Sequence, residues 1–331
     1  MPRRRRRIVS NTCYEICFRA RNTLPLVAYR LIKLIIGAAI ARTQMDDKVV
    51  LCHDIWNGSH PHIIVVAKDS LAFVKFYAEI QKRLTDILKR LLGLDYLRIW
   101  EGYPRVTELC DLAAAKDSIA YLYANPAKDN LTDSIEEFPG YSSWTDFLQS
   151  KNTLLAKTVE SFPWIRLPSV PTLHSEILSS RQDANIVRHL RKVNKERHLL
   201  IRYPNAWMKC FGIETDEEVA EVNESILSLM REKEQSAREL RQNEKKSVMG
   251  ADKLRSQAIL KPHTPKKRRE NVFIKTFDNE LRVKKIEERD LFDEKCRECL
   301  ELWRKGYYDT QWPPGAFRPS LPPTVNLLPG D

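Results

Sequence analysis

The sequence predicts an α+β protein, in which an antiparallel sheet covered by helices is followed by a mainly helical, basic extension. Its 331 residues are enough for two domains, or for one domain with a long extension. Up to about residue 145, apolar residues recur with periods that alternate between two and 3.6 residues, the periods of strands and helices. Beyond that point the pattern becomes charged, helical and interrupted by prolines.

The composition favours a polyanionic partner. Lys and Arg number 55 against 44 Asp and Glu, a net charge of +11, which suits nucleic acid or an anionic membrane surface. A hydrophobic content of 43% excludes a wholly disordered chain. The best apolar stretch, residues 26–40, is interrupted by Arg30 and Lys33 and is too short to span a bilayer, and the N-terminus lacks the apolar run of a signal peptide.

The cysteines predict a reducing compartment. Their number is seven, which is odd, and they are scattered, so we expect free thiols and a cytoplasmic protein. Cys296 and Cys299 form a Cys-x-x-Cys pair on a helical stretch, but a zinc site needs a second pair of ligands. Two ordinary helix thiols are the simpler interpretation.

The first elements are strand, helix, strand and strand. Tyr14, Ile16 and Phe18 alternate with Cys13, Glu15 and Cys17, which predicts a half-buried strand. A helix is expected over 26–40, and strands over 49–56 and 60–67. The Asn-Gly-Ser sequence at 57–59 is a turn signal, so these two strands should form a hairpin.

A second helix, strand and helix follow. Asp69 is a good N-cap for a long amphipathic helix that ends at Gly93. A fourth strand is expected over 96–101, and a helix from about 109 to 125 that stops near Pro126. A helix and then a hairpin between strands is typical of the split βαβ, ferredoxin-like arrangement.

The second part carries basic and helical segments. Residues 181–201 predict a strongly basic helix and 214–241 a polar one, whereas 261–269 predict an exposed basic linker and 312–331 an irregular, proline-rich tail. We therefore divide the chain into a basic arm (1–9), a compact domain (10–145) and a helical, basic extension (146–331).

His60-Pro61-His62 opens the third strand. Residues i and i+2 of a strand share a face, so the two imidazoles could coordinate one metal ion together. The alternative is two partly exposed polar residues without a metal. Tyr121 and Asn125 share a helix face at i and i+4, and the Asn amide oxygen could complete a metal site. The alternatives are a core tyrosine and a helix stop before Pro126.

These pieces together resemble the single-tyrosine HUH insertion-sequence transposases, and most closely the REP-associated tyrosine transposases. The resemblance is carried by the His-x-His strand, the long helix after it and the string Tyr-Leu-Tyr-Ala-Asn-Pro at 121–126, and by Phe-Pro-Gly-Tyr-Ser-Ser-Trp at 138–144. It covers roughly residues 10–145. Two positions depart from the family pattern: Pro61 replaces a bulky apolar residue, and Gly58-Ser59 replaces Pro-Asn. Because proline lacks an N–H, we expect the strand to start only at His62 or to bulge there.

The resemblance implies a metal-dependent transposase that cleaves and rejoins single-stranded DNA at hairpin-flanked sites. Tyr121 would be the nucleophile that forms a 5′-phosphotyrosine link, with His60, His62 and Asn125 as ligands of Mg or Mn. From ligand chemistry alone, Zn or Mn would be allowed. The partner would be single-stranded or hairpin DNA in the bacterial cytosol or nucleoid, bound by a monomer or homodimer. The alternative is a non-catalytic protein of the same fold that binds hairpin DNA or RNA. A membrane-surface protein that uses the arginine arm is disfavoured, because no amphipathic helix lies beside the arm.

Basic residues outside the motif are predicted to contact DNA phosphates, and solvated basic faces are the alternative. They lie in the arm, the basic helix and the linker: Arg3, Arg4, Arg5, Arg188, Arg191, Lys192, Lys195, Lys266, Lys267, Arg268 and Arg269.

Overall fold

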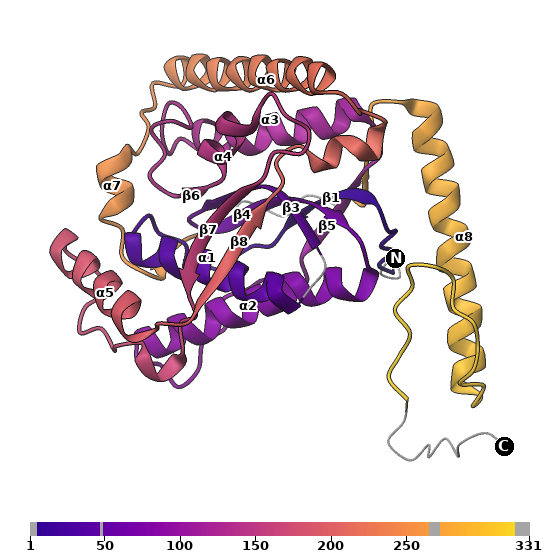
Figure 1. The fold of residues 1–331 in the computed structure, drawn as a ribbon, viewed down its shortest axis with the longest axis horizontal. Helices are drawn as coiled ribbons and strands as arrows, with labels where there is room; N and C mark the ends of the chain where they lie inside the picture. The colour runs from indigo at the N-terminus through magenta and orange to yellow at the C-terminus, as the bar shows by residue number, and fades with distance from the viewer. Residues whose placement is uncertain (1–4, 47–48, 265–271, 322–331) are drawn as a thin grey trace.

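A six-stranded sheet with the strand order β10-β5-β1-β4-β3-β6 forms the centre of the computed structural model, which describes residues 5–46, 49–264 and 272–321 (Figure 1). Neighbouring strands are antiparallel, except that β10 runs parallel to β5. The strands are β1 (Thr12–Cys17), β3 (Val49–Asn57), β4 (His60–Ala67), β5 (Arg105–Leu109), β6 (Tyr141–Ser142) and β10 (Ile274–Lys275).

The structure confirms the predicted central hairpin and the predicted helix that Asp69 caps. Strands β3 and β4 are joined by Gly58 and Ser59, with Asn57 paired to His60. The Asp69 side chain accepts a hydrogen bond from the Ala72 amide at 2.7 Å, which caps α2 (Ser70–Leu91). The apolar stripe predicted for this helix is buried along its length.

Helices cover both faces of the sheet, so the protein has two apolar cores (Figure 1). One face carries α1 (Arg30–Asp46) and α2; the other carries α3 (Leu112–Lys128), α4 (Trp144–Ser150) and α6 (Asp216–Asn243). Along β4, Ile63 and Val65 belong to the first core, whereas Ile64 and Val66 belong to the second. Strand β1 is therefore buried on both faces, and the prediction of a half-buried strand is wrong: Glu15 is only 8% exposed.

Three predicted boundaries are also wrong. The fourth strand is β5 at 105–109, whereas residues 96–101 make one isolated bridge, between Ala20 and Trp100. Helix α1 begins at Arg30, four residues after its apolar pattern begins. Helix α3 continues past Pro126 to Lys128, because residues 124–127 are buried and packed along α6. Tertiary packing here overrides the tendency of proline to end a helix.

Segments after residue 145 pack onto this framework. An antiparallel pair, β7 (Thr158–Pro163) and β8 (Arg197–Arg202), lies against α1 (Figure 1). The predicted helix over 181–201 is instead α5 (Ser180–Val193) followed by β8, with Asn194 as the C-cap. Residues 198, 200 and 202 are buried and alternate with more exposed neighbours, which is a strand period rather than a helix period.

Buried contacts connect the extension to the first part of the chain, and two of them involve Phe162 and Arg202. The buried Phe162 ring lies over Gly37 of α1, where an added Cβ would sit 2.2 Å from two ring carbons. The buried Arg202 guanidinium donates to Asp54 and Asp146 at 2.7 Å each and to the Tyr141 hydroxyl at 2.8 Å. The boundaries 1–9, 10–145 and 146–331 nevertheless stay predictions.

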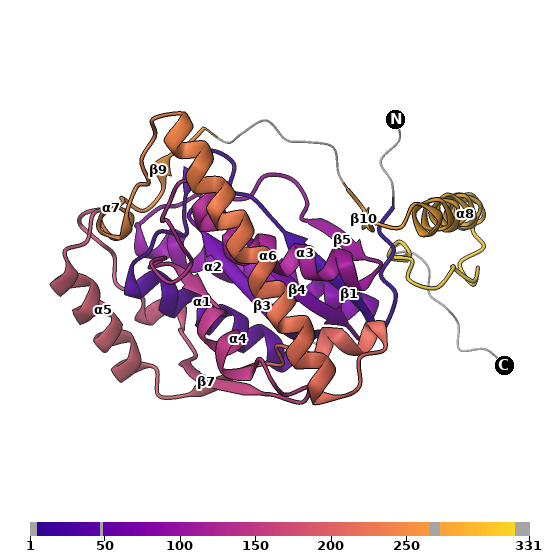
Figure 2. The same cartoon turned by 90° about the horizontal axis from the view of Figure 1, so that it is seen from above.

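The remaining elements lie at the periphery. They are β2 (Thr23–Leu24) paired with β9 (Lys261–Pro262), two short 3-10 turns (Leu167–Ser169 and Ala206–Phe211), α7 (Ala251–Arg255) and α8 (Asn279–Arg304). Figure 2 shows α8 standing at one end of the molecule, beside the N-terminal arm and β10. Residues 312–321 of the predicted proline-rich tail form no helix or strand. Among the described residues, no helix is both long and apolar enough to cross a bilayer.

Candidate active site

The His60–His62 pair lies on β4, on the face that α3 covers. Both histidines belong to the strand, and Pro61 pairs with Trp56 without a local register shift, so the expected late start or bulge at His62 is wrong. In a two-residue hairpin the residues that flank the loop form the hydrogen-bonded pair, so Pro61 falls in a non-hydrogen-bonded pair with β3. On the other side, the ladder with β1 begins at His62. Proline therefore costs no ladder bond here, and the two ring centroids lie 5.2 Å apart.

Each imidazole is oriented through its Nδ1 atom. His62 Nδ1 donates to the Glu15 carboxylate at 2.6 Å, and His60 Nδ1 lies 2.9 Å from the Ser59 hydroxyl. Burial would raise the pKa of Glu15, but the hydrogen bond and charge of His62, together with Arg105, outweigh it and lower that pKa. Glu15 is therefore an ionised carboxylate behind a histidine, an arrangement common around metal-binding histidines. The Nε2 atom of each imidazole lies on the other side of the ring, and that of His60 lies 4.0 Å from Asp129 Oδ2.

Tyr121 on α3 faces this pair, whereas Tyr123 does not. The Tyr121 ring centroid lies 5.8 Å from that of His62, and the Lys128 ammonium lies 4.4 Å from the Tyr121 ring centroid. Burial and the negative charges of Asp129 and Glu15 raise the pKa of Tyr121. Tyr123 is fully buried and its hydroxyl lies 2.9 Å from both His53 and Ser143, so it is part of the core.

Asn125 lies on the face of α3 that is turned toward the two histidines, one helical turn after Tyr121 and one turn before Asp129. Tyr121, Asn125 and the C-cap residue Asp129 are spaced four apart, so they share one helix face. Because Tyr121 contacts His62 and Asp129 Oδ2 lies 4.0 Å from His60 Nε2, this face is turned toward the pair. Asn125 is 1% exposed, and its amide nitrogen has no hydrogen-bond partner among the described residues.

These residues fit a divalent ion. Within the described ranges, no group of three or more His, Cys, Asp or Glu side chains is placed to hold a metal. The candidate set instead consists of two imidazoles and an amide, whose imidazole nitrogens and amide oxygen can bind a divalent ion. The unpartnered Asn125 amide nitrogen is a hydrogen-bond donor, so it suits an anion such as phosphate. Their role as metal ligands stays a prediction.

Cationic residues surround the site, and the sequence pattern did not predict them. Burial lowers the pKa of His60, as do the charges of His62, Arg19, Arg105 and His263. Arg105 Nη2 also lies 4.0 Å from Glu15 Oε1. These groups come from separate segments, so no local motif could have found them. A positive environment of this kind attracts phosphate.

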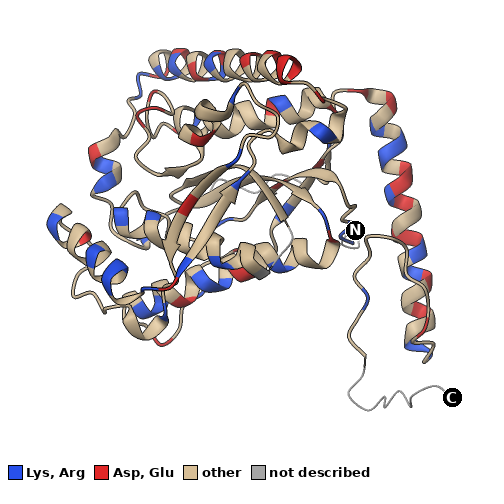
Figure 3. Cartoon of the chain, viewed as in Figure 1, with Lys and Arg blue, Asp and Glu red and all other residues tan. Residues whose placement is uncertain are grey.

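The predicted DNA-contacting residues lie elsewhere or outside the described ranges. Helix α5, which carries Arg188, Arg191 and Lys192, packs against α1 and so lies on the opposite face of the sheet from α3, the helix that carries Tyr121 (Figure 1). Figure 3 shows the basic residues of α5 in blue. Lys195 follows in the loop before β8. Arg5 contacts α8, where its amide donates to Asp293. Arg3, Arg4 and the run Lys266, Lys267, Arg268 and Arg269 lie outside the described residues.

The cysteines are all free. Cys296 and Cys299 are both buried on α8, and Cys299 Sγ donates to the Gln311 carbonyl at 3.4 Å. They fit the simpler interpretation of two thiols on a helix.

Comparisons with known proteins find one remote similarity. Neither protein-family models nor curated protein sequences match the chain. A solved structure of a REP-associated tyrosine transposase bound to a REP hairpin is similar over 45% of this chain and 86% of its own, with 18% identity and a TM-score of 0.39. The function is therefore inferred from the site residues themselves.

Proposed function

We propose that this protein is a metal-dependent, tyrosine-using DNA strand transferase that cleaves and rejoins single-stranded DNA at hairpin-flanked sites. One observation carries the proposal: the Tyr121 ring packs against His62 of the His60–His62 pair, the buried Glu15 carboxylate orients His62, and cationic residues surround the site. In this proposal β1-α1-β3-β4-α2-β5 is a ferredoxin-like unit, and the elements after residue 145 form its extension.

The nucleophile would be the Tyr121 hydroxyl. Its oxygen forms a bond to the scissile phosphorus while the bond to the 3′-oxygen breaks, and the phenolic proton is balanced by the one taken up by the leaving 3′-oxygen. The products are a 5′-phosphotyrosine and a free 3′-hydroxyl. Attack by a second 3′-hydroxyl reverses the step and joins strands, so ATP is not needed.

Phenol is a weak nucleophile at neutral pH, since its ordinary pKa is about 10. Burial and the charges of Asp129 and Glu15 raise the pKa of Tyr121 further, and the Arg105 guanidinium opposes them. The Lys128 ammonium, 4.4 Å from the ring centroid, would also stabilise negative charge as it develops on the phenolic oxygen. His60, His62 and Asn125 would hold Mg or Mn, and the bound ion would polarise the scissile phosphate. Glu15 fixes the tautomer of His62, so that its Nε2 offers a lone pair.

The test is a covalent adduct. The protein is incubated with end-labelled, hairpin-tailed single-stranded DNA and Mn, and denaturing gels are examined for label that migrates with protein. We expect an adduct with the parent and with Tyr123→Phe if that variant folds, but not with Tyr121→Phe. All three should bind the hairpin with similar affinity.

Chelation supplies the second arm of the test. EDTA should abolish the adduct, and added Mn should restore it. Cleavage that persists in EDTA would refute the metal role, whereas hairpin binding without any adduct would support the alternative, a non-catalytic nucleic-acid-binding protein.

A further inference from the structure

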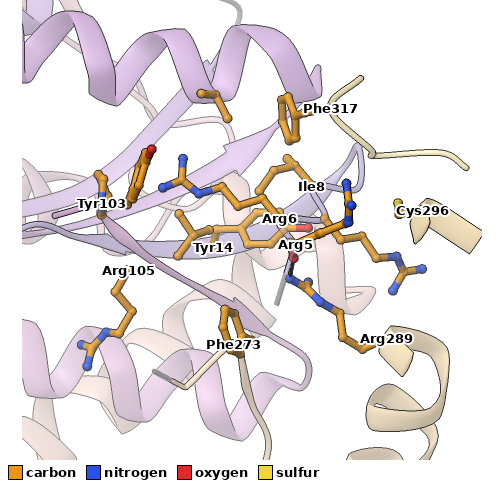
Figure 4. A pocket seen from close by; sticks show the side chains of 14 residues that line it. Arg5, Arg6, Ile8, Tyr14, Tyr103, Arg105, Phe273, Arg289, Cys296 and Phe317 are labelled. Carbon is orange, nitrogen blue, oxygen red and sulfur yellow. Dashed lines mark hydrogen bonds between the residues drawn. The ribbon is translucent and has the colours of Figure 1, made fainter. Parts of the chain in front are cut away.

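A second concave site lies between the sheet edge, the N-terminal arm and α8 (Figure 4). It is a pocket of about 500 Å³, in the size range of small-molecule sites. Five arginines line it, and no Asp or Glu is among the described residues that do so. They are Arg5, Arg6 and Arg7 of the arm, Arg105 of β5 and Arg289 of α8.

Arg289 carries the strongest signal of a missing ligand. Its side chain is only 6% exposed and points into the pocket toward Arg5 (Figure 4). One terminal nitrogen donates to the Arg5 carbonyl, but Nε is buried without a hydrogen-bond partner among the described residues. Burial lowers the pKa of Arg289, and the charges of Asp293 and Glu108 oppose this. A buried guanidinium with an unused donor is costly unless an anion completes it.

Aromatic rings line the same pocket. The Arg289 Cζ atom lies 5.2 Å from the centroid of the Phe273 ring. Tyr103 and Phe317 also line the pocket. The Tyr103 side chain is 58% exposed and holds the Arg6 guanidinium 5.2 Å from its ring centroid. Guanidinium groups that bind phosphate, next to rings on which a base can stack, are the combination that nucleotides require.

We propose that this pocket binds one unpaired nucleotide of the DNA strand, with its phosphate on Arg289 and its base on Tyr103. The inference rests on the proposed function for the identity of the ligand. Arg105 connects the two sites, because it lines the pocket and also lies 4.0 Å from Glu15, which orients His62. The charge of Arg105 also acts on Tyr121, so a strand bound in the pocket would reach a residue that both sites share.

The experiment compares two DNAs by fluorescence anisotropy: a blunt hairpin and the same hairpin with a single-stranded tail. The ratio of their affinities measures the contribution of the unpaired nucleotides. Tyr103→Ala should reduce this ratio about fivefold or more, the effect of removing the stacking of one base. Arg289→Gln should also reduce this ratio. In a plot of log affinity for the tailed DNA against log salt concentration, the slope should become shallower by about 0.7, the value for one single-strand phosphate that is no longer bound.

Matched controls lie outside the pocket. Tyr96→Ala replaces another exposed tyrosine, and Arg304→Gln another arginine of α8; neither should change the ratio. Because Tyr103 is exposed, its variant tests the pocket even if Arg289→Gln fails to fold. Equal ratios for the parent and Tyr103→Ala would overturn the proposal.

Two further arms separate the possible sources of the ligand and the two proposals. Free dAMP should compete with the single-stranded tail for the parent protein but not for the pocket variants. If dAMP binds in the pocket while tailed and blunt hairpins bind with equal affinity, the pocket belongs to free nucleotides and the assignment to the strand is overturned. Tail binding that depends on Tyr103 in a protein that forms no covalent adduct would refute the proposed cleavage but uphold the pocket. A covalent adduct, together with tail binding that the pocket variants do not change, would uphold the proposed cleavage but refute the pocket.

Discussion

Replacing Gly37 by alanine should destabilise the protein, although helix propensity alone predicts the opposite. Glycine inside a helix is about 1 kcal/mol less favourable than alanine, so an ordinary Gly→Ala change would stabilise. Here the new Cβ would lie 2.2 Å from two carbons of the buried Phe162 ring. Relieving an overlap of this kind in a packed core costs about 1–3 kcal/mol. We therefore expect a net loss of about 0–2 kcal/mol.

The assay is equilibrium unfolding in urea, with a double-mutant cycle as the control. Phe162→Ala alone should cost about 3–5 kcal/mol, because the ring is buried. In that background Gly37→Ala should change sign and stabilise by up to about 1 kcal/mol. Stabilisation by Gly37→Ala in the parent protein would refute the packing of β7 on α1.

Three other perturbations follow from the site, the core and the surface. Glu15→Gln should keep hairpin binding but lower the cleavage rate about 10- to 100-fold, because the carboxylate behind the histidine is removed; an unchanged single-turnover rate would contradict this. His53 has its pKa lowered to about 3 by burial, so the unfolded state binds more protons between pH 6.5 and 3, and stability falls as the pH falls. Urea unfolding should show that His53→Gln removes up to about 1.4 kcal/mol per pH unit of this dependence, and identical slopes would exclude His53 as the cause. Changing Arg188, Arg191 and Lys192 to alanine tests the predicted DNA contacts of α5, which lies on the opposite face of the sheet from Tyr121. If the hairpin reaches α5, the change should weaken binding and flatten its log–log salt dependence by about 0.9 for each DNA phosphate that the variant no longer neutralises; equal salt slopes would make this a solvated face.

Local sequence signals predicted the parts of the fold that depend on neighbouring residues. The hairpin at 57–60 follows from its turn residues, and the start of α2 follows from the Asp69 cap. The shared face of His60 and His62 follows from the strand period, and the shared face of Tyr121 and Asn125 from the helix period. These periods survive tertiary packing, because they are set by the backbone.

Features that depend on distant segments escaped prediction. Alternation at 96–101 resembles that at 105–109, and only pairing with β1 decides which becomes the strand. Strand β10 joins β5 from more than 150 residues away. The alternation of β1 predicted that Glu15 faces solvent, yet α3 covers that face and makes the carboxylate part of the site. A polar residue on a covered strand face is a functional signal that a single strand pattern cannot reveal.

The measurement that tests the central claim most directly is the location of the covalent DNA link. After reaction, the adduct is digested with nuclease and trypsin, and the peptide Asp117–Lys128, which contains both Tyr121 and Tyr123, is fragmented in a mass spectrometer. The proposed mechanism predicts a nucleotide phosphate on Tyr121 alone. A nucleotide on Tyr123, or on a peptide from another part of the chain, would contradict it.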